Sequence, residues 1–82
     1  MSLFDKWLQS GDDAIQNAAN LVDQATTQYN AKQLTLAEYR ELCNDILDYQ
    51  SIAANIADMT RRQAVWDAFQ AIQSIVNAVS GL

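Results

Sequence analysis

The apolar residues of this 82-residue chain recur at helical spacing from its beginning. In the first stretch the intervals alternate between four and three residues, which is the spacing of a heptad seam on one helix face. The seam consists of Phe4, Leu8, Gly11, Ile15, Ala18, Val22, Ala25 and Tyr29. It predicts a helix over residues 3–31. Gly11 occupies a seam position, and Ser10 with Asp13 gives a weak cap signal. A kink at residues 10–11 and a straight helix are therefore equally consistent with the sequence.

The start of a second helix has the strongest local signal. Thr35 and Glu38 have the spacing of a capping box, and Leu34 and Tyr39 stand at the positions of a hydrophobic staple. The helix is predicted to begin at Leu36 and to extend to residue 58, with the seam Tyr39, Leu42, Ile46, Tyr49, Ala53 and Ile56. The short connection predicts that it is the antiparallel neighbour of the first helix, so the two form an αα-hairpin.

The segment DMTRRQ, residues 58–63, separates this seam from a third apolar pattern on another face. Continuing the three-four spacing beyond Ile56 meets only polar residues, whereas the apolar positions are Val65, Phe69, Ile72, Val76 and Val79. Nine residues separate Ile56 from Val65, which at about 100° per residue places the two almost half a turn out of phase. The apolar face therefore changes sides at DMTRRQ.

Two all-α architectures are consistent with this phase change. In one, Thr60 caps a third helix over residues 61–80, with Gln63 at the box position, and this helix closes a three-helix bundle. In the other, a single helix runs from Leu36 to Ser80 for about 65–70 Å, and its second half must be covered by an oligomer or a partner. The TRRQ cap favours the closed bundle, whereas the absence of glycine and proline at this point favours the continuous helix.

Composition supports a single helical domain over residues 1–82. Half of the residues are apolar, none is proline and two are glycine, which leaves few of the residues that hairpins and sheets need. At this length only about 60–65% of the unfolded surface is buried, so we expect a homo-oligomer or a protein partner to contribute to stability. The single cysteine, Cys43, and the lack of a signal-peptide pattern indicate a reducing, cytoplasmic location.

The charge and polarity of the chain argue against two classes of partner. Ten acidic and five basic residues give a net charge of −5, which repels nucleic-acid phosphates. The chain has no run of eighteen apolar residues that could span a bilayer. The C-terminal helix carries Asp67, Gln70, Ser74 and Asn77 on its polar face in place of lysines, so membrane-surface binding is not expected.

No residue pattern indicates an enzyme, a metal or a cofactor. The chain has no histidine for a Glu-x-x-His metal site or for activating a nucleophile, and Cys43 is interpreted as a small packing residue. The most concentrated polar groups are four carboxylates at helical spacing, Glu38, Glu41, Asp45 and Asp48. They are interpreted as a solvated helix face or as an acidic stripe for a basic partner. The pair Arg61 and Arg62 is interpreted as solvated turn residues or as partners of this stripe across a dimer.

Two functional hypotheses follow. The first is a non-enzymatic helical protein that self-associates, or docks on a larger complex, through a C-terminal apolar face formed by Val65, Trp66, Phe69, Ile72, Val76 and Val79. The alternative is a small acidic regulator or inhibitor that binds an enzyme or a nucleic-acid-binding protein through the acidic stripe. The sequence leaves the identity of the partner, the number of subunits and the biological process open.

The segments MSLFDKW and AKQLTLAEYRELCNDILD resemble the small helical accessory proteins of tailed bacteriophages. Many of those proteins open with a short M-x-L-F-D segment and enter a helical hairpin with L-T-x-x-E-Y-x-x-L. The resemblance covers about a third of the chain. It implies a role in the virion, in its assembly or in host takeover, and it carries no catalytic residues over to this sequence.

Overall fold

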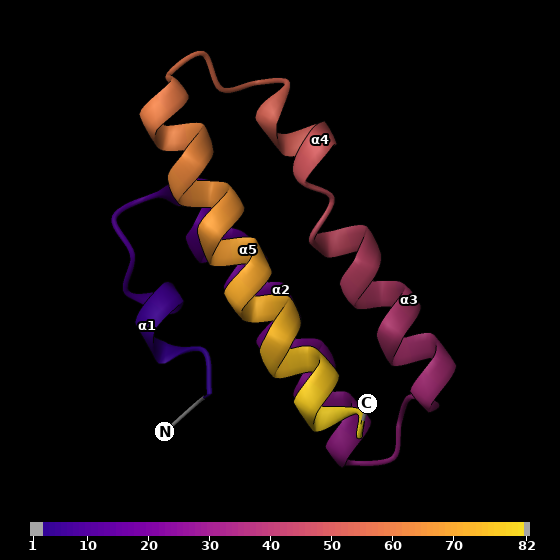
Figure 1. Cartoon of the computed structure of the whole chain (residues 1–82). Coiled ribbons are helices and arrows are strands. Elements are labelled where there is room, and N and C mark those ends of the chain that lie inside the picture. Colours follow the sequence, from indigo (N-terminus) through magenta and orange to yellow (C-terminus); the bar gives the residue numbers. More distant parts are fainter. Residues whose placement is uncertain (1–2, 82) are drawn as a thin grey trace.

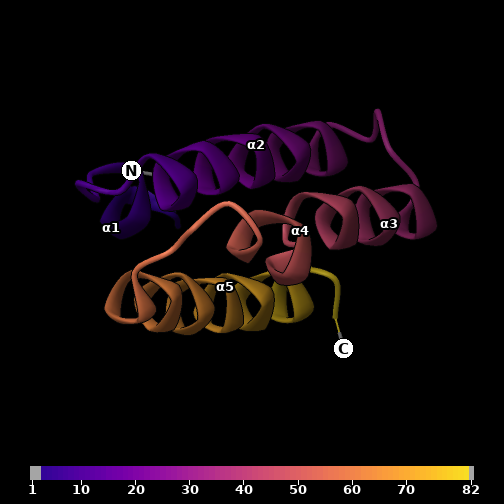
Figure 2. The ribbon, with the colours of Figure 1, turned by 90° about the horizontal axis from the view of Figure 1, so that it is seen from above.

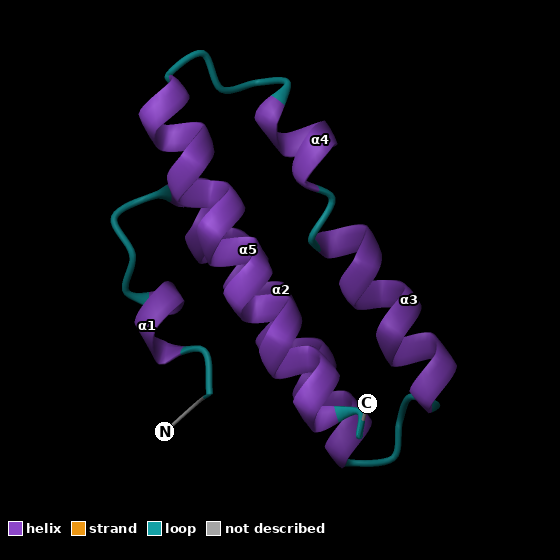
Figure 3. Cartoon of the chain, viewed as in Figure 1, coloured by secondary structure: helices purple, strands orange, loops and turns teal. Residues whose placement is uncertain are grey.

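The computed structural model describes residues 3–81 of the chain. Within this range the chain forms helices joined by short loops and contains no strand, so the prediction of an all-α fold is confirmed (Figure 3). The helices, in chain order, are α1 (Asp5–Leu8), α2 (Asp13–Asn30), α3 (Leu36–Ile46), α4 (Tyr49–Ala53) and α5 (Met59–Val79).

The longer segments form a closed three-helix bundle. α2 packs against α3 and α5, and both α3 and α4 pack against α5. α2 and α5 run in the same direction, and the α3–α4 segment returns antiparallel to them (Figures 1 and 2). The longest dimension is 39 Å, which is too short for a continuous second helix of about 65–70 Å. The chain therefore adopts the closed bundle and not the hairpin with one long second helix.

The first predicted helix is interrupted near the expected kink, and the interruption is a complete break. α1 ends at Leu8, and α2 begins after Asp12, whose carboxylate accepts hydrogen bonds from the N–H groups of Ala14 and Ile15 at 2.9 and 3.3 Å. Asp12 is thus the cap that the sequence assigned to Ser10, and its negative charge also meets the positive end of the helix dipole. The break lets α1 pack against α2 (Figure 1). Phe4, the residue before α1, is fully buried.

The second helix begins as predicted. Thr35 Oγ1 accepts a hydrogen bond from the N–H of Glu38 at 3.1 Å, and Glu38 Oε1 accepts one from the N–H of Thr35 at 2.9 Å, which completes the capping box. In the preceding turn Lys32 adopts a left-handed backbone conformation with a φ of 64°, which costs a residue with a Cβ more than it costs glycine. The turn and the capping box set α3 antiparallel to α2.

The helix predicted over residues 36–58 is shorter and broken. α3 ends at Ile46, and α4 begins after Asp48, whose carboxylate accepts a hydrogen bond from the N–H of Ser51 at 3.3 Å. Because an aspartate stabilises a new helix start, Asp48 competes with continuation of α3. α4 then ends at Ala53. As a result of the break, α3 packs mainly against α2, whereas α4 packs mainly against α5.

The third helix begins two residues earlier than predicted, at Met59. Its N-cap is Asp58, whose carboxylate accepts hydrogen bonds from the N–H groups of Thr60 and Arg61 at 2.8 and 3.3 Å, so the prediction of Thr60 as the cap is wrong. Residues 54–58 form the turn between α4 and α5. Arg62 Nε donates a hydrogen bond to the carbonyl oxygen of Ile56 at 2.5 Å and thereby ties this turn to α5.

The core consists of two clusters of buried side chains. The first cluster contains Phe4, Ala19, Val22, Ala25, Tyr39, Cys43, Ile72 and Val76. The second cluster contains Ile15, Ala18, Ile56, Val65, Ala68 and Phe69. Ile56 and Val65, which are out of phase on a single helix, meet in the second cluster because the chain reverses between them. The phase change therefore reflects the turn at residues 54–58, directly before α5, and DMTRRQ itself forms the N-cap and the beginning of α5.

Candidate functional site

The C-terminal face predicted for self-association is part of the core. Its fully buried members are Val65, Phe69, Ile72 and Val76. Val79 is partly buried against the first cluster. Of the six residues only Trp66 is exposed, with 43% of its surface accessible. The face is covered by the other helices of the same chain, so in the folded bundle it is not the accessible docking surface that the sequence predicted.

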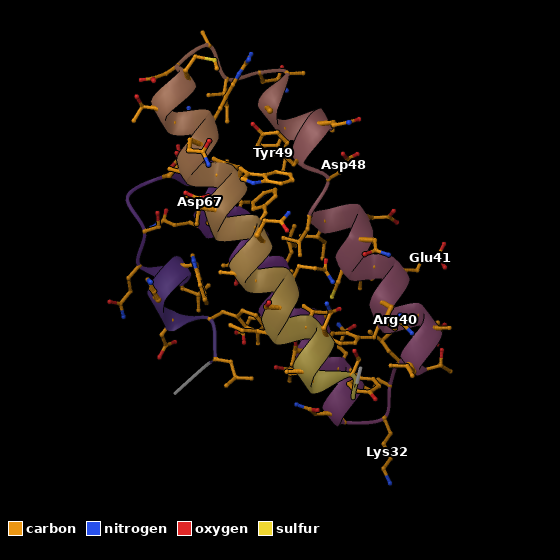
Figure 4. The ribbon with its side chains drawn as sticks, viewed as in Figure 1. Lys32, Arg40, Glu41, Asp48, Tyr49 and Asp67 are labelled. Atoms are coloured by element: carbon orange, nitrogen blue, oxygen red, sulfur yellow. The ribbon has the colours of Figure 1, made fainter. Side chains whose placement is uncertain are left out.

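Trp66 has a role within the bundle. Its ring meets the ring of Tyr49 edge-on, with centroids 5.1 Å apart and planes at 77°. Figure 4 shows Tyr49 pointing from α4 toward α5. Edge-to-face pairs of this kind contribute about 0.5–1.5 kcal/mol beyond area burial. Trp66 therefore holds the short α4 against α5, although part of its own surface is accessible.

The acidic stripe divides into two pairs of carboxylates. Glu38 and Asp48 cap helices, and the hydrogen bond from the Thr35 N–H is the main cause that lowers the pKa of Glu38. Glu41 and Asp45 are exposed on α3, and their side chains form no hydrogen bond or ion pair within residues 3–81. Glu41 and Asp48 point away from the bundle (Figure 4). The stripe is thus a solvated face with two helix caps and two carboxylates that remain available to a partner.

Both residues of the arginine pair bind within the chain. Arg61 forms a bidentate ion pair with Asp12, with 2.5 Å between Nε and Oδ2 and 3.2 Å between Nη2 and Oδ1. The hydrogen bond from Arg61 is the main cause that lowers the pKa of Asp12, and Asp12 in turn raises the pKa of Arg61. Arg62 donates a hydrogen bond to the Ile56 carbonyl oxygen, so both guanidinium groups have a partner within the chain. The ion pair joins the N-termini of α2 and α5.

A small polar group lies inside the first cluster. The hydroxyl oxygens of Thr26 and Tyr39 are 2.7 Å apart, and the Thr26 hydroxyl donates to the carbonyl oxygen of Val22 at 2.8 Å. Burial is the main cause that raises the pKa values of the Tyr39 phenol and of the neighbouring Cys43 thiol. The thiolate is the reactive form of cysteine, so burial in the first cluster and the raised pKa both make this thiol less reactive. Residues 3–81 also hold no cluster of acidic or sulfur ligands suited to a metal ion.

A groove lies between α2 and the α3–α4 segment and ends at the start of α5. Its volume is ≈ 580 Å³. Its apolar lining consists of Ala14, Ala18, Leu21, Ile46, Ile52 and Ile56. Its polar lining consists of Asp13, Asn17, Asn55 and Arg61. This α2–α4 groove is a concave, largely apolar site with a few polar groups, which is the usual composition of a binding site.

The α2–α4 groove follows from the helix break at Leu47 and Asp48. α4 packs mainly against α5 and not against α2. Side chains of α2 and α4 therefore line the groove and are not packed against each other. Leu21 lines it with 39% of its surface accessible. Leu21 and Ile52 lie outside the predicted seams, so the seams did not point to them. The available signal was a second apolar spacing on α2, from Ala14 to Leu21, one position away from the seam.

No helix within residues 3–81 has the length and apolar character that crossing a membrane requires. No family model matches the sequence, and neither a curated protein nor a solved structure matches it.

Proposed function

We propose that this protein is a non-catalytic helical interaction module that docks on a larger protein assembly through the α2–α4 groove. The supporting observation is the position of the accessible apolar surface. The core uses the C-terminal face, whereas the groove leaves leucine and isoleucine side chains open to a partner. Apolar grooves between helices commonly receive the apolar side chains of a partner helix.

The groove exists only in the folded bundle. Leu21 lies on α2, Ile46 on α3 and Ile56 in the turn before α5, so segments far apart in the sequence form one surface. A partner would therefore recognise the fold and not a linear segment. Burial of this surface contributes about 25 cal/mol per Å² of apolar area, and the preformed walls reduce the ordering cost of binding.

Two finer expectations remain part of the proposal. The resemblance to phage accessory proteins suggests that the assembly is a virion, an assembly intermediate or a host complex. Homo-oligomerisation is a further prediction, but a second copy would have to use a surface other than the C-terminal face.

Site-specific photo-crosslinking tests the proposal directly. A photoreactive amino acid replaces Leu21 in the groove or Leu36 on α3, and both leucines have 39% of their surface accessible. Leu36 does not line the groove and is the matched control. In cells that naturally contain the protein, we expect a discrete protein adduct from position 21 and none from position 36. No adduct at position 21, or equal adducts at both positions, contradicts the proposal, and an adduct of twice the chain mass identifies a second copy as the partner.

A further inference from the structure

We infer that residues 48–55 form a strap that opens as a unit from the intact bundle and thereby extends the α2–α4 groove onto the surface of α5 beneath α4. The strap consists of the cap residue Asp48, α4 and the first two residues of the following turn. The opening itself needs no partner, whereas its role in docking rests on the proposed function. The inference is based on how the strap is attached to the rest of the chain.

The hydrogen bonds of the strap's polar side chains stay inside the strap. The Asp48 carboxylate accepts a hydrogen bond from the Ser51 N–H at 3.3 Å, and the Asn55 side-chain amide donates one to the Ser51 carbonyl oxygen at 3.5 Å. Within residues 3–81 no hydrogen bond or ion pair joins residues 48–55 to α2, α3 or α5. Polar contacts thus stabilise the short helix itself and do not hold it to the bundle.

The helical hydrogen-bond ladder is interrupted where the strap begins. The last bond of α3 runs from the Leu47 N–H to the Cys43 carbonyl oxygen at 2.9 Å, and the first bond of α4 runs from the Ile52 N–H to the Asp48 carbonyl oxygen at 3.2 Å. In the described part of the chain, the N–H groups of residues 48–50 form no backbone hydrogen bond. The strap therefore moves without breaking a backbone hydrogen bond to α3.

A few apolar side chains attach the strap to the bundle. Tyr49 meets the ring of Trp66 edge-on, and Tyr49 and Ile52 are partly buried against the second cluster. Ala53 is the only buried residue of the strap. The other five residues of the strap are exposed, namely Asp48, Gln50, Ser51, Ala54 and Asn55. Opening therefore removes little apolar contact, while the whole segment regains conformational freedom.

Both neighbours of the strap are held in the core. Leu47 packs against both clusters. Ile56 belongs to the second cluster, and its carbonyl oxygen accepts a hydrogen bond from Arg62 Nε at 2.5 Å. With these two residues fixed, the strap opens as a short loop and leaves the packing of α2 against α3 and α5 in place. Local units of this kind open at a lower free energy than the whole domain.

Opening of the strap changes the surface at the groove. Ile52 and Asn55 are the strap residues that line the groove, so their withdrawal removes part of one wall. Withdrawal of Tyr49 uncovers the ring of Trp66 on α5. A partner that enters the open form would therefore contact Leu21 and Trp66 together, and aromatic side chains are enriched in the buried centres of protein interfaces.

Native-state amide hydrogen exchange of the full chain tests the opening. The N–H groups of Ile52 and Ala54 report on the strap, because both donate to carbonyl oxygens within it at 3.2 Å. We expect both to show the same opening free energy and to be protected at least about a hundredfold less than the N–H groups of Phe69 and Ile72 on α5. Exchange of the strap amides should also be insensitive to low urea concentrations, since the opening exposes little surface. The same protection and the same urea dependence for strap and α5 amides would overturn the inference.

Matched variants separate the strap from the bundle. Asp48→Ala removes the cap of α4 and should speed the exchange of the strap amides about threefold to tenfold. The control Asp45→Ala should change it by less than about twofold, because the Asp45 side chain forms no hydrogen bond within residues 3–81. Ile72→Val, in the first cluster, should speed the exchange of α5 amides at least about twofold and leave the strap amides unchanged. Equal effects of the two aspartate variants, or strap amides that Ile72→Val accelerates as much as α5 amides, would refute the strap.

Photo-crosslinking at position 21 is a separate test of docking. A discrete adduct at this position, without local exchange of residues 48–55, would support the proposed function and overturn the strap. Local exchange of the strap without an adduct would support the strap and contradict the proposed function.

Discussion

The contact between Thr26 and Tyr39 provides a sharp test of how α3 is positioned against α2, and hence of the groove that these helices form. Both hydroxyl groups are buried, and the Tyr39 O–H has the Thr26 oxygen as its acceptor at 2.7 Å, since the Thr26 hydroxyl donates to the Val22 carbonyl. The change Thr26→Val keeps the shape of the side chain and removes the acceptor. A buried hydroxyl that loses its partner costs about 1–3 kcal/mol.

The partner variant should cost less. Tyr39→Phe removes one hydrogen bond, for about 0.5–1.5 kcal/mol, but Thr26 keeps its bond to Val22 and the ring keeps its stacking on Tyr29 at 4.7 Å. The double variant has no unpaired hydroxyl, so its stability should approach that of the wild type. The two changes are therefore strongly non-additive, as expected for residues in direct contact. Against a total stability of about 4–12 kcal/mol for a domain of this size, each single change is measurable.

Urea unfolding followed by far-ultraviolet circular dichroism measures these differences, and equal m-values show that the unfolded surface is the same. In thermal unfolding, each kcal/mol of stability that Thr26→Val removes should lower the melting temperature by about 4–8 °C. Thr27→Val is the matched control, because Thr27 is the next residue on α2 and its hydroxyl is exposed; it should change stability by less than about 0.5 kcal/mol. A double variant as unstable as the sum of the single variants would show that the hydroxyls do not meet and that α3 has another register.

Three further predictions concern the core, the junction of α2 with α5 and the thiol. Phe69→Ala should destabilise the folded chain by about 3–5 kcal/mol in urea unfolding, whereas the exposed neighbour Gln70→Ala should have little effect; similar losses would place the C-terminal face outside the core. Because the pKa of Asp12 is lowered in the folded state, its stabilising contribution is complete above the unfolded pKa of about 3.9 and is lost as the pH falls through the lower folded value. Asp12→Asn keeps a capping side chain but removes the charge that pairs with Arg61. The thermal stability of this variant should therefore fall below that of the wild type near neutral pH and converge with it in acid. A constant difference down to acid pH would contradict the ion pair with Arg61. Cys43 is buried, so its reaction with a thiol reagent should be slow in the native protein and should accelerate with urea in step with unfolding, and rapid native labelling would refute its place in the core.

Local sequence rules captured the beginning of α3 and the change of apolar face near DMTRRQ. The capping box of Thr35 and Glu38 depends on groups three residues apart, so the sequence contains the whole interaction. The phase difference between Ile56 and Val65 likewise predicted that one straight helix could not bury both on the same face, but it left a turn and a continuous helix as alternatives. The same rules misplaced the caps, because aspartates at positions 12 and 58, which the sequence also shows, compete with Ser10 and Thr60.

The sequence by itself thus determined an all-helical chain, the beginning of α3 and the place where the apolar face changes sides, because each depends on periodicity and on contacts within a few residues. Only the tertiary structure decided that the α5 face is covered by the chain itself, that Arg61 belongs to Asp12, and that Leu21, Ile46 and Ile56 form one groove. These features join residues from different elements of the fold. Packing between distant segments, which no local pattern contains, therefore created the surface proposed for function.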